Sequence, residues 1–227
     1  MAGFNFTPEQ HALVGAAVSE AEKNTDGEIV TIVTEQSDAY HDVALHYAVA
    51  AMLLLVAGAA LWPWILEAKL EWLQGGWGAA GLNLHQLLFL LLLGEAAIFL
   101  IVRYALAWTP LRMLATPSAT KARRVQRRAM QFFKSSAEKR TVGRVGILLY
   151  VSIAEHRAEI IADEAIHSKV APERWGEAMA ALVGKLKRGD PAGGMADAVG
   201  QMAAILKEHF PKTDADVNEL PDRLIEL

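Results

Sequence analysis

Five acidic residues lie at or beside the ends of predicted strands, where carboxylates could bind a divalent cation. They are Asp26, Glu28, Asp38, Glu155 and Asp163. Calcium and magnesium take several oxygen ligands, and ligands of α/β sheets favour the carboxyl ends of strands. These residues are therefore the candidate metal ligands, with calcium or magnesium as the candidate cofactor. The structural alternative is that Asp38 caps a helix and that Glu155 belongs to a turn.

The neighbouring residues offer little further chemistry, and we assign no catalytic residue. His156 follows Glu155 and could form an acid–base pair with it, although the tip of a hairpin usually exposes such residues. The chain has no Walker loop, no G-x-S-x-G elbow and no H-E-x-x-H motif. GDPAGG lacks the Lys-Ser/Thr of a phosphate loop, so we predict an interhelix turn there. Cysteine is absent, which removes disulfides, thiolate zinc sites and cysteine nucleophiles.

Glu95 is an acidic residue near the middle of an otherwise almost wholly apolar stretch, LHQLLFLLLLGEAAIFLIVRYALAW. A charged carboxylate in the middle of a bilayer costs roughly 2.5–3.5 kcal/mol on insertion scales. We therefore expect an uncharged Glu95 that is hydrogen-bonded to the other apolar helix or to a second copy of the chain. Small residues at 57–60 would allow close helix approach. A proton or ion path is the alternative, but two helices alone cannot enclose one.

Two apolar stretches, residues 43–66 and 84–108, are each long enough to cross a membrane. A membrane helix needs roughly 20 predominantly apolar residues. Trp62 and Trp64 stand at the far end of the first stretch, where aromatic rings favour the headgroup layer. The two stretches therefore predict a transmembrane helical hairpin that places both flanking segments on the same side of the bilayer.

A basic block follows the second apolar stretch. Residues 103–144 contain eleven Lys or Arg and one acid, whereas residues 1–102 contain two Lys and eleven acids. The positive-inside rule then predicts a bacterial inner-membrane protein with both termini in the cytoplasm. A nucleic-acid interface is a formal alternative, but the membrane explains the block more simply, and we expect no nucleic-acid partner. The predicted lipid-headgroup ligands are Arg103, Arg112, Arg123, Arg124, Arg127 and Arg128.

The flanking segments read as a mixture of helices and strands. Thr7 and Pro8 mark the start of a helix over 8–23. β-Branched residues predict a strand over 28–35, and RVGILLYVSI predicts a buried central strand over 144–153. We further predict helices over 118–139, 172–188 and 194–209, a strand over 158–163 antiparallel to the central one, and a loose acidic tail over 212–227.

A lone strand before the hairpin needs partners from the other side of it. We therefore expect strand 28–35 to pair with strand 144–153, with helix 118–139 as the crossover between them. The predicted fold is α/β: a small mixed sheet with helices on both faces, interrupted by the inserted hairpin. The predicted parts are residues 1–42, 43–110, 111–211 and 212–227, of which the first and third form one domain.

Several stretches resemble the TPM domain family. They are E-x4-T-x-GEIV at Glu20 to Val30, SDAY at Ser37 to Tyr40, the segment from Thr141 to Ile166 that contains GILLYVS, and Trp175 with GDPAGG. The resemblance implies a compact α/β sandwich. It also implies relatives among membrane-anchored bacterial proteins and plastid proteins linked to photosystem II repair, some of them weak acid phosphatases and some binders of calcium. Many members carry an Asp-Asn-Gly-like turn before the central strand, where this chain has Val142, Gly143 and Arg144.

Two functions follow from these observations. The preferred one is a membrane-anchored, non-catalytic binding or assembly module whose partners are the bilayer and another membrane protein or a second copy. The alternative is a weak metal-dependent acid phosphatase that uses the acidic strand ends.

Overall fold

The structure is a computed structural model that describes residues 5–64, 84–136, 145–213 and 222–227. The chain divides into two compact units. The first comprises Met1–Ala39 and Ser118–Leu227, and the second comprises Tyr40–Pro117. The first unit is thus built from two chain segments that lie on either side of the second unit in the sequence.

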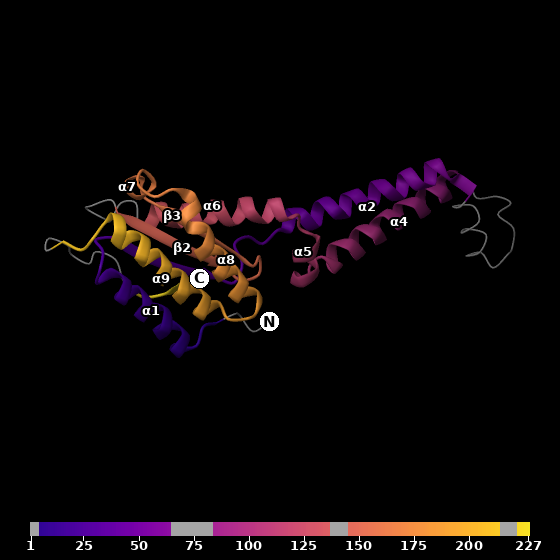
Figure 1. Cartoon of the computed structure of the whole chain (residues 1–227). Coiled ribbons are helices and arrows are strands. Elements are labelled where there is room, and N and C mark those ends of the chain that lie inside the picture. Colours follow the sequence, from indigo (N-terminus) through magenta and orange to yellow (C-terminus); the bar gives the residue numbers. More distant parts are fainter. Residues whose placement is uncertain (1–4, 65–83, 137–144, 214–221) are drawn as a thin grey trace. The chain divides into compact units, whose positions relative to one another are not determined.

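The first unit contains a four-stranded mixed sheet (Figure 1). The strand order is β3-β2-β1-β4; β1 runs parallel to β2 and β4, and β3 runs antiparallel to β2. This confirms the small mixed sheet and both predicted strand pairings. The elements are α1 (Pro8–Glu22), β1 (Glu28–Thr34), α6 (Ser118–Ser136), β2 (Gly146–Ser152), β3 (Arg157–Ala162), α7 (Glu164–His167), η1 (Pro172–Trp175), α8 (Gly176–Lys187), α9 (Pro191–His209) and β4 (Ile225–Glu226).

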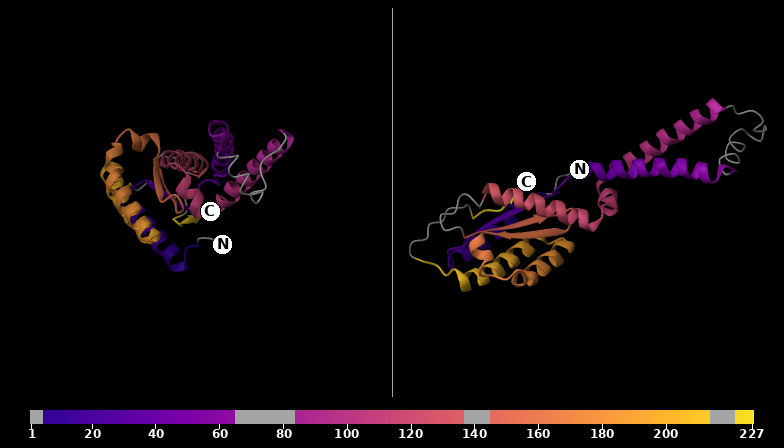
Figure 2. Two further views of the ribbon diagram at one scale, coloured as in Figure 1. Left: turned by 90° about the vertical axis from the view of Figure 1, so that its right-hand side faces the viewer. Right: turned by 90° about the horizontal axis from the view of Figure 1, so that it is seen from above.

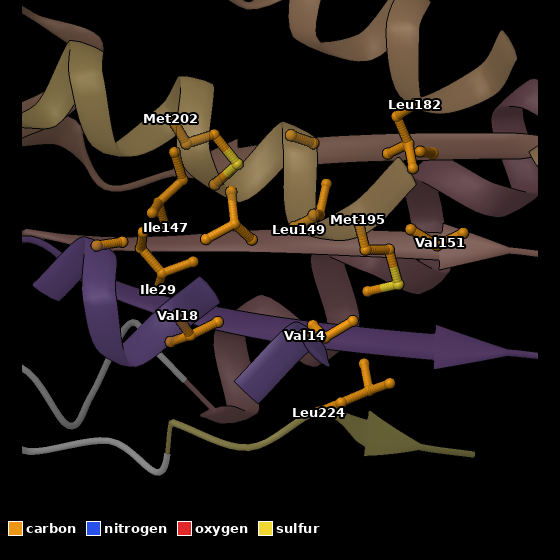
Figure 3. Packing of buried hydrophobic residues seen from close by; sticks show 14 of the residues in the cluster. Val14, Val18, Ile29, Ile147, Leu149, Val151, Leu182, Met195, Met202 and Leu224 are labelled. Atoms are coloured by element: carbon orange, nitrogen blue, oxygen red, sulfur yellow. The ribbon is translucent and has the colours of Figure 1, made fainter. Parts of the chain in front are cut away.

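Helices cover both faces of this sheet, as the right-hand view of Figure 2 shows for α6 on one side and α8 and α9 on the other. Successive strand residues point to opposite faces, and every residue of β1 and β2 is buried. This two-sided burial explains why the central strand has a continuous apolar sequence. One core joins the sheet to α1, α8 and α9 through Val14, Val18, Ile29, Ile147, Leu149, Leu182, Met195 and Met202 (Figure 3). The other joins it to α6 through Val30, Ile32, Val125, Ala129, Phe133, Leu148 and Tyr150.

Local signals fix where two of the helices begin. Thr7 and Gln10 form the predicted capping box of α1, and Pro8 occupies the first helical position. The side chain of Asp190 accepts a hydrogen bond from the backbone N–H of Gly193 and so caps α9. GDPAGG therefore contains the predicted interhelix turn, and α9 begins three residues earlier than expected, at Pro191.

The end of the acidic tail is ordered, so the prediction of a loose tail is wrong for residues 222–227; residues 214–221 lie outside the described part. Leu224 is buried in the core, and β4 pairs with β1. The backbone N–H of Leu227 donates to the carbonyl of Val33 at 3.0 Å, and the Glu226 carboxylate accepts from the backbone N–H of Phe6 at 3.2 Å. A strand of two residues has too little pattern to be recognised from the sequence.

The second unit contains α2 (His41–Leu61), α4 (Leu84–Ala105) and α5 (Thr109–Ala115). α2 and α4 lie side by side in Figure 1, and a Cβ at Gly94 would lie 3.4 Å from Leu55 Cδ2. Both helices are long and apolar enough to cross a membrane. They correspond to the predicted spans 43–66 and 84–108, although residues 65 and 66 lie outside the described part.

Candidate functional site

Polar side chains form a buried network where β1 and β2 end next to each other, at the pair Thr34 and Ser152. The Glu155 carboxylate accepts from the backbone N–H of Ser37 at 2.9 Å and from the Ser152 hydroxyl. Ser37 Oγ donates to Ser152 Oγ and contacts Tyr150 Oη, both at 2.9 Å. Since a hydroxyl has one proton, Tyr150 must donate to Ser37. Burial raises the pKa of Tyr150, so this phenol remains a donor at neutral pH.

An open hollow of about 560 Å³ lies beside this network. The guanidinium of Arg157 donates to the carbonyl of Ser118 at 3.2 Å and to its hydroxyl at 3.0 Å, which holds the start of α6 against the hairpin between β2 and β3. The hollow is lined by three cationic side chains and one carboxylate, Glu155, so it is suited to anionic groups. It is lined by Ser118, Lys121, Glu155, His156, Arg157, Ala158, Val183 and Lys187.

Asp38 and His156 lie near the same end of the sheet as Glu155, and each has its own surroundings. Asp38 follows β1, and its carboxylate forms an ion pair with Arg124 of α6 at 2.8 Å. His156 occupies the turn after β2 with φ of 49° and lines the hollow beside Glu155. Because both Glu155 oxygens accept from Ser37 and Ser152, the proposed acid–base pair has competing partners.

The other three predicted acids lie elsewhere. The side chain of Asp163 is buried at the opposite end of the sheet, because β3 is antiparallel, and it accepts from the backbone N–H of Gly146 at 2.9 Å. Glu28 is buried at the start of β1, at that same end. Asp26 accepts from the backbone N–H of Thr213 at 2.7 Å and from its hydroxyl at 2.8 Å.

These placements fit a calcium or magnesium site poorly. Such ions need several converging oxygens, and within the described ranges no three His, Asp or Glu side chains could hold a metal ion together. The segment 142–144, where the family's acidic turn would lie, falls outside the described residues. As placed, Asp26, Glu155 and Asp163 accept hydrogen bonds from different segments of the unit, and Asp38 pairs with Arg124.

The predicted lipid-binding arginines also differ in their surroundings. Arg123, Arg127 and Arg128 are exposed on α6. Arg124 is taken up by the Asp38 ion pair, and Arg103 is half-buried in the last turn of α4. Arg112 is buried, and its guanidinium donates to the carbonyls of residues 106 and 107 and to the hydroxyl of residue 109. The guanidinium of Arg112 therefore binds the turn between α4 and α5 and is not presented on the surface.

Glu95 is half-buried on α4, next to Gly94, where this helix packs against α2. Within the described part of one chain, its carboxyl has no hydrogen bond or ion pair. The expected partner on α2 is therefore not seen, and a partner in a second copy remains a prediction.

Sequence analysis missed the residues that surround Glu155. Ser152 carried a usable signal, because it is a polar residue at the end of an apolar buried strand. Ser37 stood out only as part of the family-like SDAY stretch, and Lys187 belongs to α8, far along the chain. Nothing local in the sequence shows that these side chains share one end of the sheet.

Comparison with known proteins agrees with this architecture. The model of the TPM domain matches residues 107–205, which include α6, β2, β3, α8 and most of α9. The NMR structure of the BA42 protein from the psychrophilic bacterium Bizionia argentinensis is similar, with a TM-score of 0.56 and 17% sequence identity over 100% of this chain and 99% of that one. A likeness at this identity shows the fold alone. No curated protein matches. Residues 107–205 of the chain therefore match the TPM domain family.

Proposed function

We propose that this protein is a membrane-anchored TPM-domain module that binds other molecules at the bilayer surface and does not catalyse a reaction. The observation that carries the proposal is the exposure of α2 and α4. No residue of α4 is buried, and α2 buries only Val43, Ala44 and Ala48. A buried core helix of a soluble protein would show the opposite pattern.

The energetics of that exposure favour lipid around the two helices. Leu54 is 71% exposed on α2, and Ile101 is 66% exposed on α4. Burying each such side chain in an apolar medium contributes roughly 1.5–3 kcal/mol, and large exposed apolar patches mark membrane or protein contacts. Helices of 21 and 22 residues are each about 30 Å long, the thickness of the hydrocarbon layer.

Charge supports one orientation of this hairpin. Residues 103–144 carry eleven Lys or Arg, whereas the segment between α2 and α4 carries only Lys69. The positive-inside rule then places both termini in the cytoplasm of a bacterial cell. Exposed Arg123, Arg127 and Arg128 would face anionic headgroups there, each contributing about 1 kcal/mol to attraction.

The polar sites of the first unit support binding over hydrolysis. A metal-dependent phosphatase, the alternative, needs carboxylates that converge on a cation. Here Glu155 and Asp163 accept hydrogen bonds from backbone N–H groups at opposite ends of the sheet. A second copy or another membrane protein is the partner class that we propose.

Single cysteines test the orientation directly, because the natural chain has none. Glu173→Cys should react with a membrane-impermeant maleimide only after cells are lysed. Gln74→Cys, in the segment between the helices, should react in cells whose outer barrier has been opened. The reverse pattern contradicts the orientation, and protection or reaction of both residues alike in intact cells contradicts the hairpin.

The absence of catalysis is tested with the purified full chain and a chromogenic phosphate ester, with and without calcium or magnesium. We expect no hydrolysis above that of the Asp163→Asn variant. Metal-dependent hydrolysis that Asp163→Asn abolishes would favour the phosphatase.

A further inference from the structure

The outer edge of β3 opens into a groove in the first unit. Among the described strands, β3 stands at the end of the sheet and pairs only with β2. A hollow of about 440 Å³ lies along β3. Residues of α6 line one part of it, and residues of α7, η1 and α8 line another. The lining residues that matter here are Met130, Glu159, Ile160, Ile161, Ala162 and Met179.

The lining shows that this groove lies on the edge of the strand and not on one face of the sheet. Residues 159–162 are consecutive, and all four touch the hollow. Successive side chains of a strand point to opposite faces; accordingly, Ile161 packs with the α6 core, whereas Ile160 packs with the opposite core. A hollow can contact side chains on both faces of the sheet only if it wraps around the edge of the strand. The backbone N–H and C=O groups on that edge therefore face the groove.

The groove combines apolar walls with negative charge. Ile160 and Ile161 are half-buried, and Met130 is 38% exposed. Two carboxylates, Glu159 and Glu164, line the hollow together with the imidazole of His167. Burial raises the pKa of Glu159, while the nearby Arg157 lowers it. A cation brought into the groove would compensate the desolvation of this carboxylate.

We propose that this groove docks an extended segment of a partner protein, which adds to β3 as a further strand and directs a Lys or Arg side chain toward Glu159. The inference deepens the proposed binding function by naming the surface and the chemistry of the partner. Backbone hydrogen bonds along an open edge supply affinity, and pockets for alternate side chains supply specificity. A second copy of β3 fits less well, because a twofold interface brings the same patch together and so places Glu159 and Glu164 of both copies in one groove.

The test uses the full chain in detergent micelles, labelled with 15N-isoleucine, and a capped peptide of sequence TVKVKV. Titration should shift the amide signals of Ile160 and Ile161 and approach saturation at millimolar concentration, while Ile29 in the core stays unchanged. The acidic counterpart TVEVEV should bind about fivefold more weakly, the scale of one partly screened ion pair. TVKVKV methylated at every second backbone nitrogen should cause no shift, because it lacks the donors for the edge.

Two variants distinguish the effect of the Glu159 charge on binding from an effect on folding. Glu159→Gln should remove the preference for TVKVKV over TVEVEV and leave the Ile29 signal in place. Glu177→Gln, a matched change outside the groove on the exposed start of α8, should keep the preference. Equal binding of both peptides to the natural chain, binding that survives methylation, or no saturable shift of Ile160 and Ile161 would each overturn the proposal. Micelles replace the bilayer in this test, so its outcome is independent of whether the anchoring proposal holds.

Discussion

Glu22 is a buried acid whose pKa is strongly changed by its surroundings. One oxygen of its buried carboxyl accepts from the backbone N–H of Ile29 at 2.8 Å, and the Asp222 carboxyl lies nearby. The pKa of Glu22 is raised from 4.5 to about 8. Burial is the main cause; the hydrogen bond from Ile29 lowers the pKa, and the nearby carboxylates of Glu28 and Asp222 raise it. Below a pH of about 8 this carboxyl is therefore mostly neutral, and it joins the end of α1 to the start of β1.

This carboxyl makes folding stability depend on pH. Between pH 4.5 and about 8 the folded chain keeps a proton that the unfolded chain releases, so the free energy of unfolding falls as pH rises through that window. Glu22→Gln should flatten this dependence and stabilise the chain above the window by on the order of 2 kcal/mol. Melting temperatures of both chains in micelles, from about pH 5 to about pH 9, check the prediction. An unchanged pH slope in Glu22→Gln would contradict it.

Ser152 links the buried network around Glu155. Its hydroxyl donates to Glu155 and accepts from Ser37. Ser152→Ala leaves buried Glu155 and half-buried Ser37 without this partner and should lower the free energy of unfolding by about 1–3 kcal/mol. Ser135→Ala is the matched control, because its exposed hydroxyl donates only to the nearby carbonyl of Phe132. Equal melting temperatures for the two variants would show that the network adds no stability.

At the level of single residues, the sequence predicted which acids stand near strand ends but not what they contact. Asp38 was recognisable as a residue that follows a strand, yet its ion-pair partner Arg124 lies 86 residues away. Glu155 and Asp163 were placed on the correct hairpin and then found at opposite ends of the sheet. Side-chain partners depend on tertiary packing, which periodicity does not encode.

Although β4 has only two residues, it pairs with β1 and holds the preceding Leu224 in the core. Leu224 precedes it and is buried against the core that contains Val14 and Val18 (Figure 3). Leu224→Ala should lower the free energy of unfolding by about 2–4 kcal/mol through lost burial and the cavity left behind. Leu227→Ala removes the same side chain at a position that is 53% exposed and should have little effect. Similar losses in both variants would contradict the packing of this strand.

α2 and α4 each contain a glycine, and only the one in α4 lies against the other helix. A Cβ at Gly94 would lie 3.4 Å from Leu55 Cδ2, whereas a Cβ at Gly58 would meet nothing within 4 Å. Gly94→Leu should therefore force the helices apart and destabilise the second unit by about 1–3 kcal/mol, while Gly58→Leu should not. Thermal loss of helical circular dichroism in micelles compares them. Equal effects would mean that the two helices do not pack through Gly94.

Element positions were more predictable than residue contacts. Strongly apolar or amphipathic stretches gave β1, β2, β3, α1 and α6 to within a few residues, because burial on one or two faces leaves a period in the sequence. β4 had no such period, and the single helix expected over 172–188 begins with the short η1. The positions of such short elements depend on their tertiary contacts with neighbouring elements.

In the whole molecule, one sheet joins two parts of the chain that are far apart in the sequence. β1 lies before the second unit in sequence and β2 after it, yet they pair along their full length. This pairing is predictable from the sequence, because a strand alone is unstable. The sheet can therefore form only when the second unit, which lies between β1 and β2 in the sequence, allows the two strands to meet.

Extraction of membranes from cells that make the intact chain tests the central claim, that lipid surrounds α2 and α4. We predict that the chain stays with the membrane pellet in high salt and in alkaline carbonate, and floats with vesicles after reconstitution. Release of the chain into the supernatant as a folded, soluble protein would contradict the account.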